Sequence, residues 1–307
     1  MENPEKGTAL FSAGMASEAE QEKLLQRERR VNSAFQKLIR NKLALIGLVI
    51  VIFMTTLAIF APLLTRYTPT ELDMINAYAK PGTGGHVLGM DELGRDLLSR
   101  IIYGARVSMI VAVGSMSVGA VIGILIGLVA GYNGGLIDSL LMRVMDGMFA
   151  FPFVLLAILL VTVLGDGMKN VILAIGIANV PGYARIVRGQ VHVVKNDEYC
   201  VAAEVLGASV PRLLFLHILP NCLSPIIIYA TLNVAGAIIS EASLSFLGLG
   251  IQPPTPSWGN ILRAGSSALI TAPHIAAFSG LAISITVLGF NIMGDGIRDM
   301  LDPKMKK

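Results

Sequence analysis

Charged and aromatic residues are scarce in this chain of 307 residues. Asp, Glu, Lys and Arg together make up 15% of the sequence, and Phe, Trp and Tyr make up 6%. Soluble domains carry charge on about 25% of their residues, so this shortage excludes an ordinary soluble domain. Hydrophobic residues instead make up 54%, and the mean hydropathy is +0.68. We therefore expect a membrane protein, and its 32 glycines favour closely packed transmembrane helices.

The sequence also lacks the common catalytic and nucleotide-binding motifs. It contains no H-E-x-x-H, G-x-S-x-G or G-x-x-x-x-G-K-[ST] pattern, the last of which would cradle the phosphates of ATP. We expect no catalytic residue, no metal and no cofactor bound by this chain, and any energy from ATP has to come from another subunit. The histidines and cysteines are too few and too dispersed to predict a metal site or a disulfide framework; they are His86, His192, His217, His274, Cys200 and Cys222.

Ionisable residues are missing from the centres of the apolar segments. Asp138, Asp146, Glu241 and Asp295 all lie near or beyond the ends of the predicted spans. Carriers coupled to protons or ions usually keep such groups at membrane depth. The sequence therefore argues against a secondary carrier or a channel that works alone. Asp146 follows Arg143 by three residues, a spacing that predicts an ion pair on one helical face.

What the sequence does contain is a series of long apolar segments. Each is long enough, or nearly so, to cross the hydrocarbon core as a helix. Prolines lie within the third and fourth of them, at Pro152 and Pro181, where we expect kinks. The six predicted spans are Leu43 to Leu64, Val107 to Ala130, Met148 to Leu164, Val171 to Val187, Leu223 to Ile239, and Phe278 to Met293.

The distribution of Lys and Arg predicts the orientation. With the N-terminus inside, 17 of these residues lie on the inner side and seven lie on the outer side. An even number of spans with both termini in the cytoplasm therefore fits the rule that inner loops are positively charged. The first apolar segment follows a polar tail of 42 residues, so we expect an uncleaved span and not a signal peptide.

These spans and loops divide the chain into segments. The cytoplasmic N-terminal tail contains Leu24, Val31, Phe35, Leu38 and Ile39 at helical spacing among basic residues, which predicts an amphipathic helix at the inner membrane face. The segments are 1–42, the N-terminal tail; 43–64, the first transmembrane helix; 65–106, an extracytoplasmic loop; 107–296, a transmembrane domain of five helices with an inner loop at about 188–222; and 297–307, a cytoplasmic C-terminal tail.

The long inner loop predicts two short helices joined by a turn. Asn196 or Asp197 can cap the first helix, and Gly207 can end it because glycine accepts the left-handed conformation of a helix stop. Ser209 can cap a second helix with proline in its first turn, and Pro220 is expected to close that helix.

The same loop resembles the signature of binding-protein-dependent ABC importer permeases, in which Glu-Ala-Ala is followed after three residues by Gly and after nine more by Ile-x-Leu-Pro. The positions that match are Ala202, Ala203, Gly207, Leu219 and Pro220. The resemblance implies an all-α membrane protein of six transmembrane helices with the ABC importer type I permease fold. It also implies that this loop forms the coupling helix that docks onto an ATPase subunit.

Two positions of the loop depart from the signature. Val201 stands where the family usually has glutamate, and His217 stands where it has isoleucine. Glu198 and Glu204 lie three residues on either side of Val201, so either of them could supply a carboxylate on roughly the same helical face. An amphipathic loop helix without any partner remains the alternative interpretation.

Further segments resemble the C-type permease subunit of dipeptide and oligopeptide importers. The clearest is residues 86–96, in which we expect Asp91, Arg95 and Asp96 to form an ion-paired cluster with turns at Gly89 and Gly94. Contact with a docked solute-binding protein is the alternative for this motif. Other matches lie at residues 103–106, 131–135, 246–250, 257–259, 294–299 and 301–303, so the resemblance covers the chain from about residue 33.

Glu241 and Trp258 are candidates for the mouth of a solute pathway. Glu241 lies near the outer end of the fifth span, where it could contact a peptide amino group or make a helix-end hydrogen bond. Trp258 follows a proline-rich outer stretch and could line the pathway or lie at the membrane interface.

The resemblance also implies partners and a location. These are a second, different permease subunit, two ATP-binding subunits that hold ATP and Mg, an extracytoplasmic solute-binding protein, and the lipid of a bacterial plasma membrane that the chain crosses several times. No nucleic acid is expected. The implied substrate is a di- or oligopeptide; nickel, glutathione or another solute is the alternative, and a membrane scaffold without transport is a third possibility that the coupling signature argues against.

Overall fold

The computed structural model describes residues 41–301, so the helix predicted in the N-terminal tail lies outside the described range. Within that range the chain is built from helices and loops, and the one β-type pairing there is a single bridge between Met90 and Asp96. The predicted all-α class is confirmed. The helices owe their length to unbroken runs of apolar residues, as in α2 (Lys42–Ile59), where Asn41 caps the first turn by accepting a hydrogen bond from the Ala44 N–H.

Five helices are long and apolar enough to cross a membrane, and a bent pair of shorter helices brings the number of spans to as many as six. The five are α2, α4 (Leu97–Asn133), α7 (Met168–Val194), the continuous helical stretch that ends with α10 (Leu219–Phe246), and α12 (Pro273–Leu301). The bent pair is α5 (Gly135–Phe149) and α6 (Phe153–Leu164).

The spanning helices extend beyond the predicted apolar segments at several ends. α4 begins at Leu97 and not at Val107, because the Asp96 carboxylate accepts a hydrogen bond of 2.7 Å from the Ser99 N–H and caps the helix there. The predicted outer loop 65–106 therefore ends at residue 96. α12 continues to Leu301, so the described part of the predicted tail 297–307 is helical.

The third span, predicted from Met148 to Leu164, is broken just before Pro152, where a kink was expected. The helix stops at Phe149, and α6 starts at Phe153 in a direction 94° away from that of α5. Pro152 explains the break, because proline has no N–H for the helical ladder and disfavours helical geometry at the residue before it. α7, in contrast, continues through Pro181.

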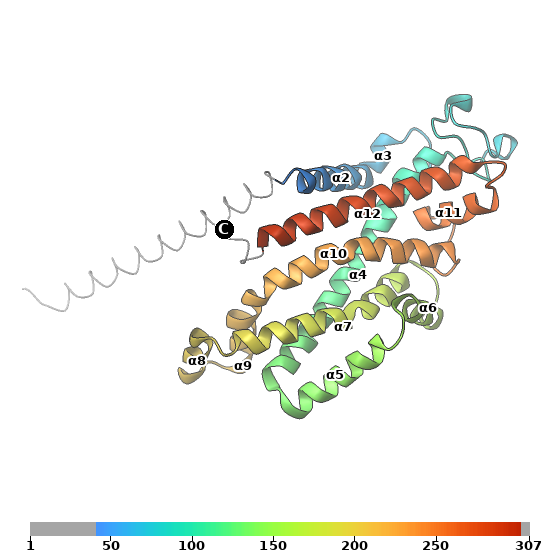
Figure 1. Ribbon diagram of the computed structural model, residues 1–307. Helices are drawn as coiled ribbons and strands as arrows, with labels where there is room; N and C mark the ends of the chain where they lie inside the picture. Colours follow the sequence, from blue (N-terminus) through green and yellow to red (C-terminus); the bar gives the residue numbers. More distant parts are fainter. Residues whose placement is uncertain (1–40, 302–307) are drawn as a thin grey trace, which may run out of the picture.

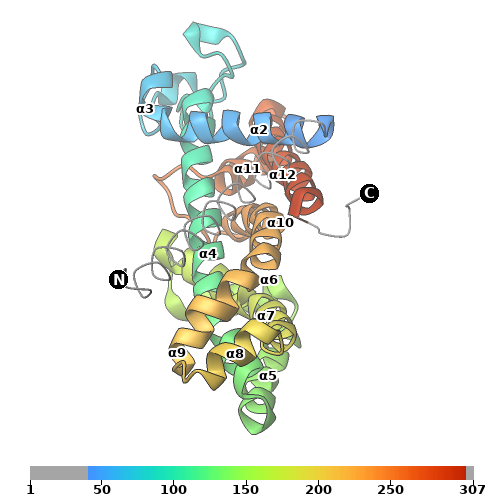
Figure 2. The ribbon, with the colours of Figure 1, turned by 90° about the vertical axis from the view of Figure 1, so that its left-hand side faces the viewer.

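The long helices lie side by side in a row. α12, α10 and α7 are neighbours, α2 lies beside α12, and α5 lies beside α7, while α4 crosses the row behind them (Figure 1; Figure 2). Two loops occupy opposite ends of the molecule. Residues 65–96, which we call the first loop, lie at one end together with α11 (Trp258–Ser267), and the helices α8 (Glu198–Val205) and α9 (Val210–Arg212) lie at the other.

Small residues on α4 allow its extensive contact with α7. A Cβ on Gly127 would lie 2.6 Å from the Val187 Cβ, and a Cβ on Gly131 would lie 2.7 Å from that of Val191. Any larger residue would therefore force the two backbones apart. The glycines that face α7 recur every four residues on one side of α4; they are Gly119, Gly123, Gly127 and Gly131.

Pro220 does not close a helix, contrary to the prediction. Residues Leu213–Ile218 form a π-helix that joins α9 directly to α10, and the Leu219 N–H donates to the Leu214 carbonyl five residues earlier. The wider π turn accommodates a proline ring that would collide with the carbonyl four residues back in a regular α-helix. The part of the loop from Val210 onward is therefore one continuous extension of α10, and its movement is tied to that helix.

Candidate functional site

The helices α8 and α9 form a compact turn at one end of the molecule. α8 starts after Asp197 and ends at Val205, and Gly207 has a positive φ of 82° as predicted for the helix stop. The Ala208 N–H donates to the Ala203 carbonyl at 3.0 Å, which satisfies a carbonyl at the end of α8. Asp197 and Ser209 occupy the expected cap positions, although neither side chain makes a capping hydrogen bond.

A buried face fixes α8 to the rest of the protein. Cys200 is almost completely buried among side chains of α7, the π-helix and α10. This burial raises the pKa of the Cys200 thiol, because the apolar surroundings disfavour the thiolate. The side chains that pack in this cluster include Val191, Val194, Leu213, Leu214, Ile218 and Cys222.

The opposite face of the turn is exposed and apolar. Val205 and Leu206 are 81% and 87% exposed, and Ala202 and Gly207 are also exposed, with open space around Gly207. Small residues beside exposed apolar ones suit the close approach of another protein. The large apolar side chains exposed on this turn are Tyr199, Val201, Val205, Leu206 and Val210.

The positions that depart from the family signature differ in their surroundings. Val201 is 47% exposed, and the flanking Glu198 and Glu204 are exposed as well, so each of these carboxylates is open to a partner. His217 lies half-buried in the π-helix, and its carbonyl accepts a hydrogen bond of 2.8 Å from the Asn221 side chain. Leu219 is half-buried, and Pro220 is exposed.

Polar side chains of α7 connect the α8 end of the molecule to α4 and α5. Arg188 makes two short hydrogen bonds to the Asp138 carboxylate, of 2.5 and 2.6 Å. The Lys195 ammonium donates to the Gly131 carbonyl at 2.9 Å and so satisfies the end of α4. Neither contact was predicted from the sequence, because each joins residues at least 50 positions apart.

The ion pair predicted between Arg143 and Asp146 does not form. Asp146 instead pairs with Arg185 of α7 at 2.5 Å, and the Arg185 guanidinium lies 4.1 Å from the centre of the Phe149 ring. The contact across two helices replaces the local one, because packing of α5 on α7 brings an arginine with a stacking partner within reach.

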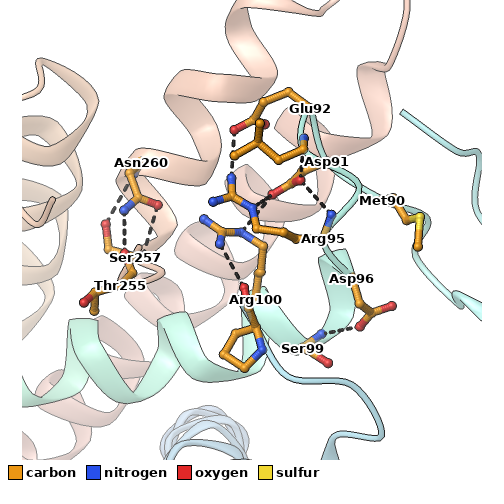
Figure 3. A network of polar contacts seen from close by, with 12 residues as sticks. Met90, Asp91, Glu92, Arg95, Asp96, Ser99, Arg100, Thr255, Ser257 and Asn260 are labelled. Atoms are coloured by element: carbon orange, nitrogen blue, oxygen red, sulfur yellow. Dashed lines mark hydrogen bonds and ion pairs between the residues drawn. The ribbon is translucent and has the colours of Figure 1, made fainter. Parts of the chain in front are cut away.

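A second polar cluster lies in the first loop and at the start of α4, at the other end of the molecule (Figure 3). The Asp91 carboxylate lies 2.7 Å from the Arg95 Nε and 3.0 Å from the Arg100 Nε, and all three side chains are buried. Arg95 also donates to Glu92 at 2.9 Å, and Arg100 donates to the Pro69 carbonyl at 3.1 Å. The pair between Asp91 and Arg95 was predicted, whereas the part played by Arg100 was missed.

Asp96 was expected to belong to this ion-paired cluster, but it does not. One of its oxygens caps α4, and the other lies 2.8 Å from the His86 Nδ1. The turn at Gly94 has a φ of +70°, and a Cβ there would collide with the Asp73 carbonyl, so only glycine fits. Gly89 likewise has a positive φ of 82°.

Glu241 and Trp258 do not line a pathway mouth, because the chain buries both completely. The Glu241 carboxylate accepts hydrogen bonds from Ser108 of α4 at 2.7 Å and from Ser245 at 2.8 Å. The Trp258 indole donates to the Ile101 carbonyl at 2.9 Å and packs closely against Gly104. Both side chains fix α4 to α10 and α11, which is a structural role.

The described residues also bear on metal binding. Within residues 41–301, no group of three or more His, Cys, Asp or Glu side chains is arranged so that it could hold a metal ion.

Comparison with known proteins gives two family matches. Residues 123–307 match the family described as binding-protein-dependent transport system inner membrane component. Residues 31–81 match the N-terminal TM domain of oligopeptide transport permease C.

Individual relatives are similar over most of their length. The chain is 45% identical to the dipeptide transport system permease protein DppC of Alkalihalophilus pseudofirmus, over 89% of this chain and 90% of that protein. It is 40% identical to the oligopeptide transport system permease protein OppC of Bacillus subtilis, over 97% and 98%. It is 42% identical to the glutathione transport system permease protein GsiD of Pectobacterium atrosepticum, over 89% and 90%.

Proposed function

The chain belongs to the family of binding-protein-dependent transport system inner membrane components, and on this basis we propose that it forms half of a pathway that carries peptides into the cell. Its relatives include permease proteins named for dipeptide and oligopeptide transport. In this proposal the chain pairs with a second, different permease subunit. Two ATP-binding subunits and an extracytoplasmic solute-binding protein complete the importer.

The observation that carries the proposal is the exposed apolar turn of α8 and α9. A soluble surface seldom leaves two side chains such as Val205 and Leu206 more than 80% exposed next to each other unless a partner covers them. The turn is nevertheless firmly attached, since Cys200 is buried on its other face. A rigid turn with an apolar outer face is suited to bind an ATPase subunit and to move together with it.

Movement of that turn would be transmitted directly to the membrane-spanning helices. The π-helix makes α9 continuous with α10, while Arg188 of α7 contacts α5 and Lys195, which directly follows α7, contacts the end of α4. Closure of the ATPase subunits around ATP and Mg would therefore displace several spans together as a rigid body. In this scheme the chain itself binds no nucleotide and has no enzymatic activity.

The proposed orientation places α8 and both termini in the cytoplasm and the first loop outside. It rests on the excess of Lys and Arg on the inner side, 17 against seven. The exposed face of α8 is then on the side of the membrane where ATP is available. The buried ion pairs of the first loop are then on the side from which substrate arrives.

Disruption of docking tests the proposal. Ala202→Arg introduces a long charged side chain on the exposed face of α8, where a close partner would clash with it and desolvate its charge. A cost of roughly 3 kcal/mol lowers affinity by more than about 100-fold. We expect the variant to insert in the membrane at the normal level, to lose the ATP-binding subunits on purification, and to lose peptide-stimulated ATP hydrolysis.

A matched control separates docking from a general effect of added charge. Leu136→Arg adds the same side chain at a position of α5 that is 89% exposed and lies outside the α8–α9 turn. This control should keep the ATP-binding subunits. If Ala202→Arg retains both the subunits and the stimulated hydrolysis, the turn is not the coupling element and the proposed function loses its support.

Glutathione is the second candidate substrate, because a relative named for glutathione transport is as similar to this chain as those named for peptides. Glutathione is itself a short peptide, so the same pathway would suit both. Binding measurements on the associated solute-binding protein, with dipeptides, longer peptides and glutathione as ligands, distinguish the two.

A further inference from the structure

A cavity of about 860 Å³ opens between α7, α10 and α12 in the half of the molecule that contains α8. Its walls mix hydrogen-bonding side chains with apolar ones. The residues that line it are Arg185, Ile186, Gly189 and Gln190 of α7; Asn221, Ser224, Pro225, Ile228, Tyr229 and Leu232 of α10; and Arg298 and Leu301 of α12.

The charges that line this cavity have one sign. Arg185 and Arg298 lie on opposite walls, and among the residues that the structure describes no Asp or Glu lines it. Arg185 shares its charge with Asp146 of α5, which leaves Arg298 as the stronger cation facing the space. The cavity therefore favours an anionic group.

The cavity extends far into the membrane-spanning part of the chain. Ser224 lies 22 residues from the end of α10 at Phe246, and Leu232 lies 14 residues from it. At about 1.5 Å per residue these positions are roughly 33 Å and 21 Å from the first-loop end of the helix. The cavity thus extends from the α8 end along about half the length of α10.

The same face of α10 continues toward the first-loop end as an open surface. Gly236 has no other atom near its Cβ position, and beyond it a second, apolar hollow of about 420 Å³ lies along α10. That hollow includes Ile239, Ser243 and Leu247. Positions three or four residues apart on a helix share a face, so both hollows lie along one stripe that runs the length of α10.

Polar side chains at the α8 ends of α7, α10 and α12 argue that the cavity contains water and not lipid. The exposed face of α2 shows what a lipid-facing surface of this chain looks like, since its exposed large residues include Leu43, Ile46, Val49 and Phe53. Arg298, Gln190 and Asn221 would lose their hydrogen bonds to water against lipid tails. A peptide could replace that water with its own amide groups.

We propose that this cavity is the cytoplasmic vestibule of the pathway, and that it holds a peptide by its C-terminal carboxylate through Arg298, assisted by Arg185. Gln190, Asn221 and the Tyr229 hydroxyl then offer hydrogen bonds to the peptide amides. The inference rests on the proposed function, because it takes the solute to be a peptide that leaves toward α8.

Two adjacent isoleucines of α10 provide a matched test of the water-filled cavity. Ile228 lines the cavity, whereas Ile227 is 46% exposed on another side of the helix and lies outside it. The importer reconstituted in liposomes would carry Ile228→Cys or Ile227→Cys and react with water-soluble methanethiosulfonates. The importer without either substitution gives the background reaction of this chain, which should be low because Cys200 and Cys222 are buried.

We expect Ile228→Cys to react at least about tenfold faster than Ile227→Cys, although Ile227 is the more exposed side chain in the isolated chain. A peptide with a free C-terminus, present on the α8 side, should slow that reaction several-fold more than the same peptide with an amidated C-terminus. Equal reaction rates at the two positions would mean that the cavity is filled by lipid or by protein, and the proposal would be wrong.

The preference of the cavity for anions is measured by comparing the rates at which an anionic and a cationic methanethiosulfonate react with Ile228→Cys. Arg298→Gln should lower the ratio of the anionic to the cationic reaction rate several-fold, whereas Arg143→Gln, a change on the exposed side of α5 outside both the cavity and the α8–α9 turn, should leave it unchanged. An unchanged ratio in Arg298→Gln would overturn the carboxylate site. None of these reactions requires ATP, so they remain informative even if Ala202→Arg shows that α8 is not the coupling element.

Discussion

The first loop and the α8–α9 turn both combine charged residues with a glycine of positive φ, yet the structure treats their side chains in opposite ways. In the first loop Asp91 is 1% exposed and contacts two arginines. On α8 both glutamates are exposed, and Leu206 is 87% exposed. The first loop satisfies its polar groups within the chain, whereas the turn leaves an apolar face for another protein.

The difference shows that a recognisable sequence motif can stabilise the fold or bind a partner. Whether its side chains are buried or exposed distinguishes these two roles. Replacements in the first loop should therefore reduce the amount of folded protein. Replacements on the exposed face of α8 should leave folding intact and affect the assembled importer.

The largest effect is expected from Gly94→Val. A Cβ at this position collides with the Asp73 carbonyl, and the positive φ adds strain, so the first loop cannot close over the start of α4. We expect little folded protein in the membrane, measured as the monodisperse fraction after detergent extraction. Gly82→Val is the control, because its φ is also positive but nothing lies near its Cβ position; similar losses in both variants would show that strain alone, and not the collision, decides the outcome.

The next effect in size is expected from Asp91→Asn. The change leaves Arg95 and Arg100 buried without their shared carboxylate, and removal of one partner from a buried ion pair costs about 3–5 kcal/mol. Glu92→Gln should cost much less, since Glu92 contacts one arginine and its side chain is 30% exposed. Thermal unfolding of the two purified variants measures the difference. Equal melting temperatures would contradict the central place given to Asp91.

The smallest effect is expected from Val201→Glu. The change introduces the residue usual in the family at a position that is 47% exposed, so it creates no buried charge. The melting temperature should stay within a few degrees, and the amount of co-purified ATP-binding subunits within about twofold, of the values for the unmodified chain. A loss of those subunits would show that the valine itself is required for docking.

The sequence predicted contacts that are local and missed those that depend on packing. The pair of Asp91 with Arg95 follows from a spacing of four residues, and the helix stop at Gly207 follows from the chemistry of glycine. Arg100 was missed because its partners come together only when the first loop folds back on α4.

The burial of Glu241 was missed for a related reason. Its partner Ser108 lies 133 positions away, on a helix whose contact with α10 no local pattern reveals. The π-helix before Pro220 likewise reflects the joining of two helices, since proline alone predicts a stop.

Hydrogen exchange in the assembled importer tests most directly whether the α8–α9 turn is the docking surface and the first loop is self-contained. Exchange would be followed by mass spectrometry in lipid nanodiscs before and after removal of the ATP-binding subunits. The account predicts that residues 198–209 exchange about tenfold more slowly when those subunits are present, while residues 86–100 exchange equally slowly in both states. Unchanged exchange in residues 198–209, or a comparable change in residues 86–100, would contradict it.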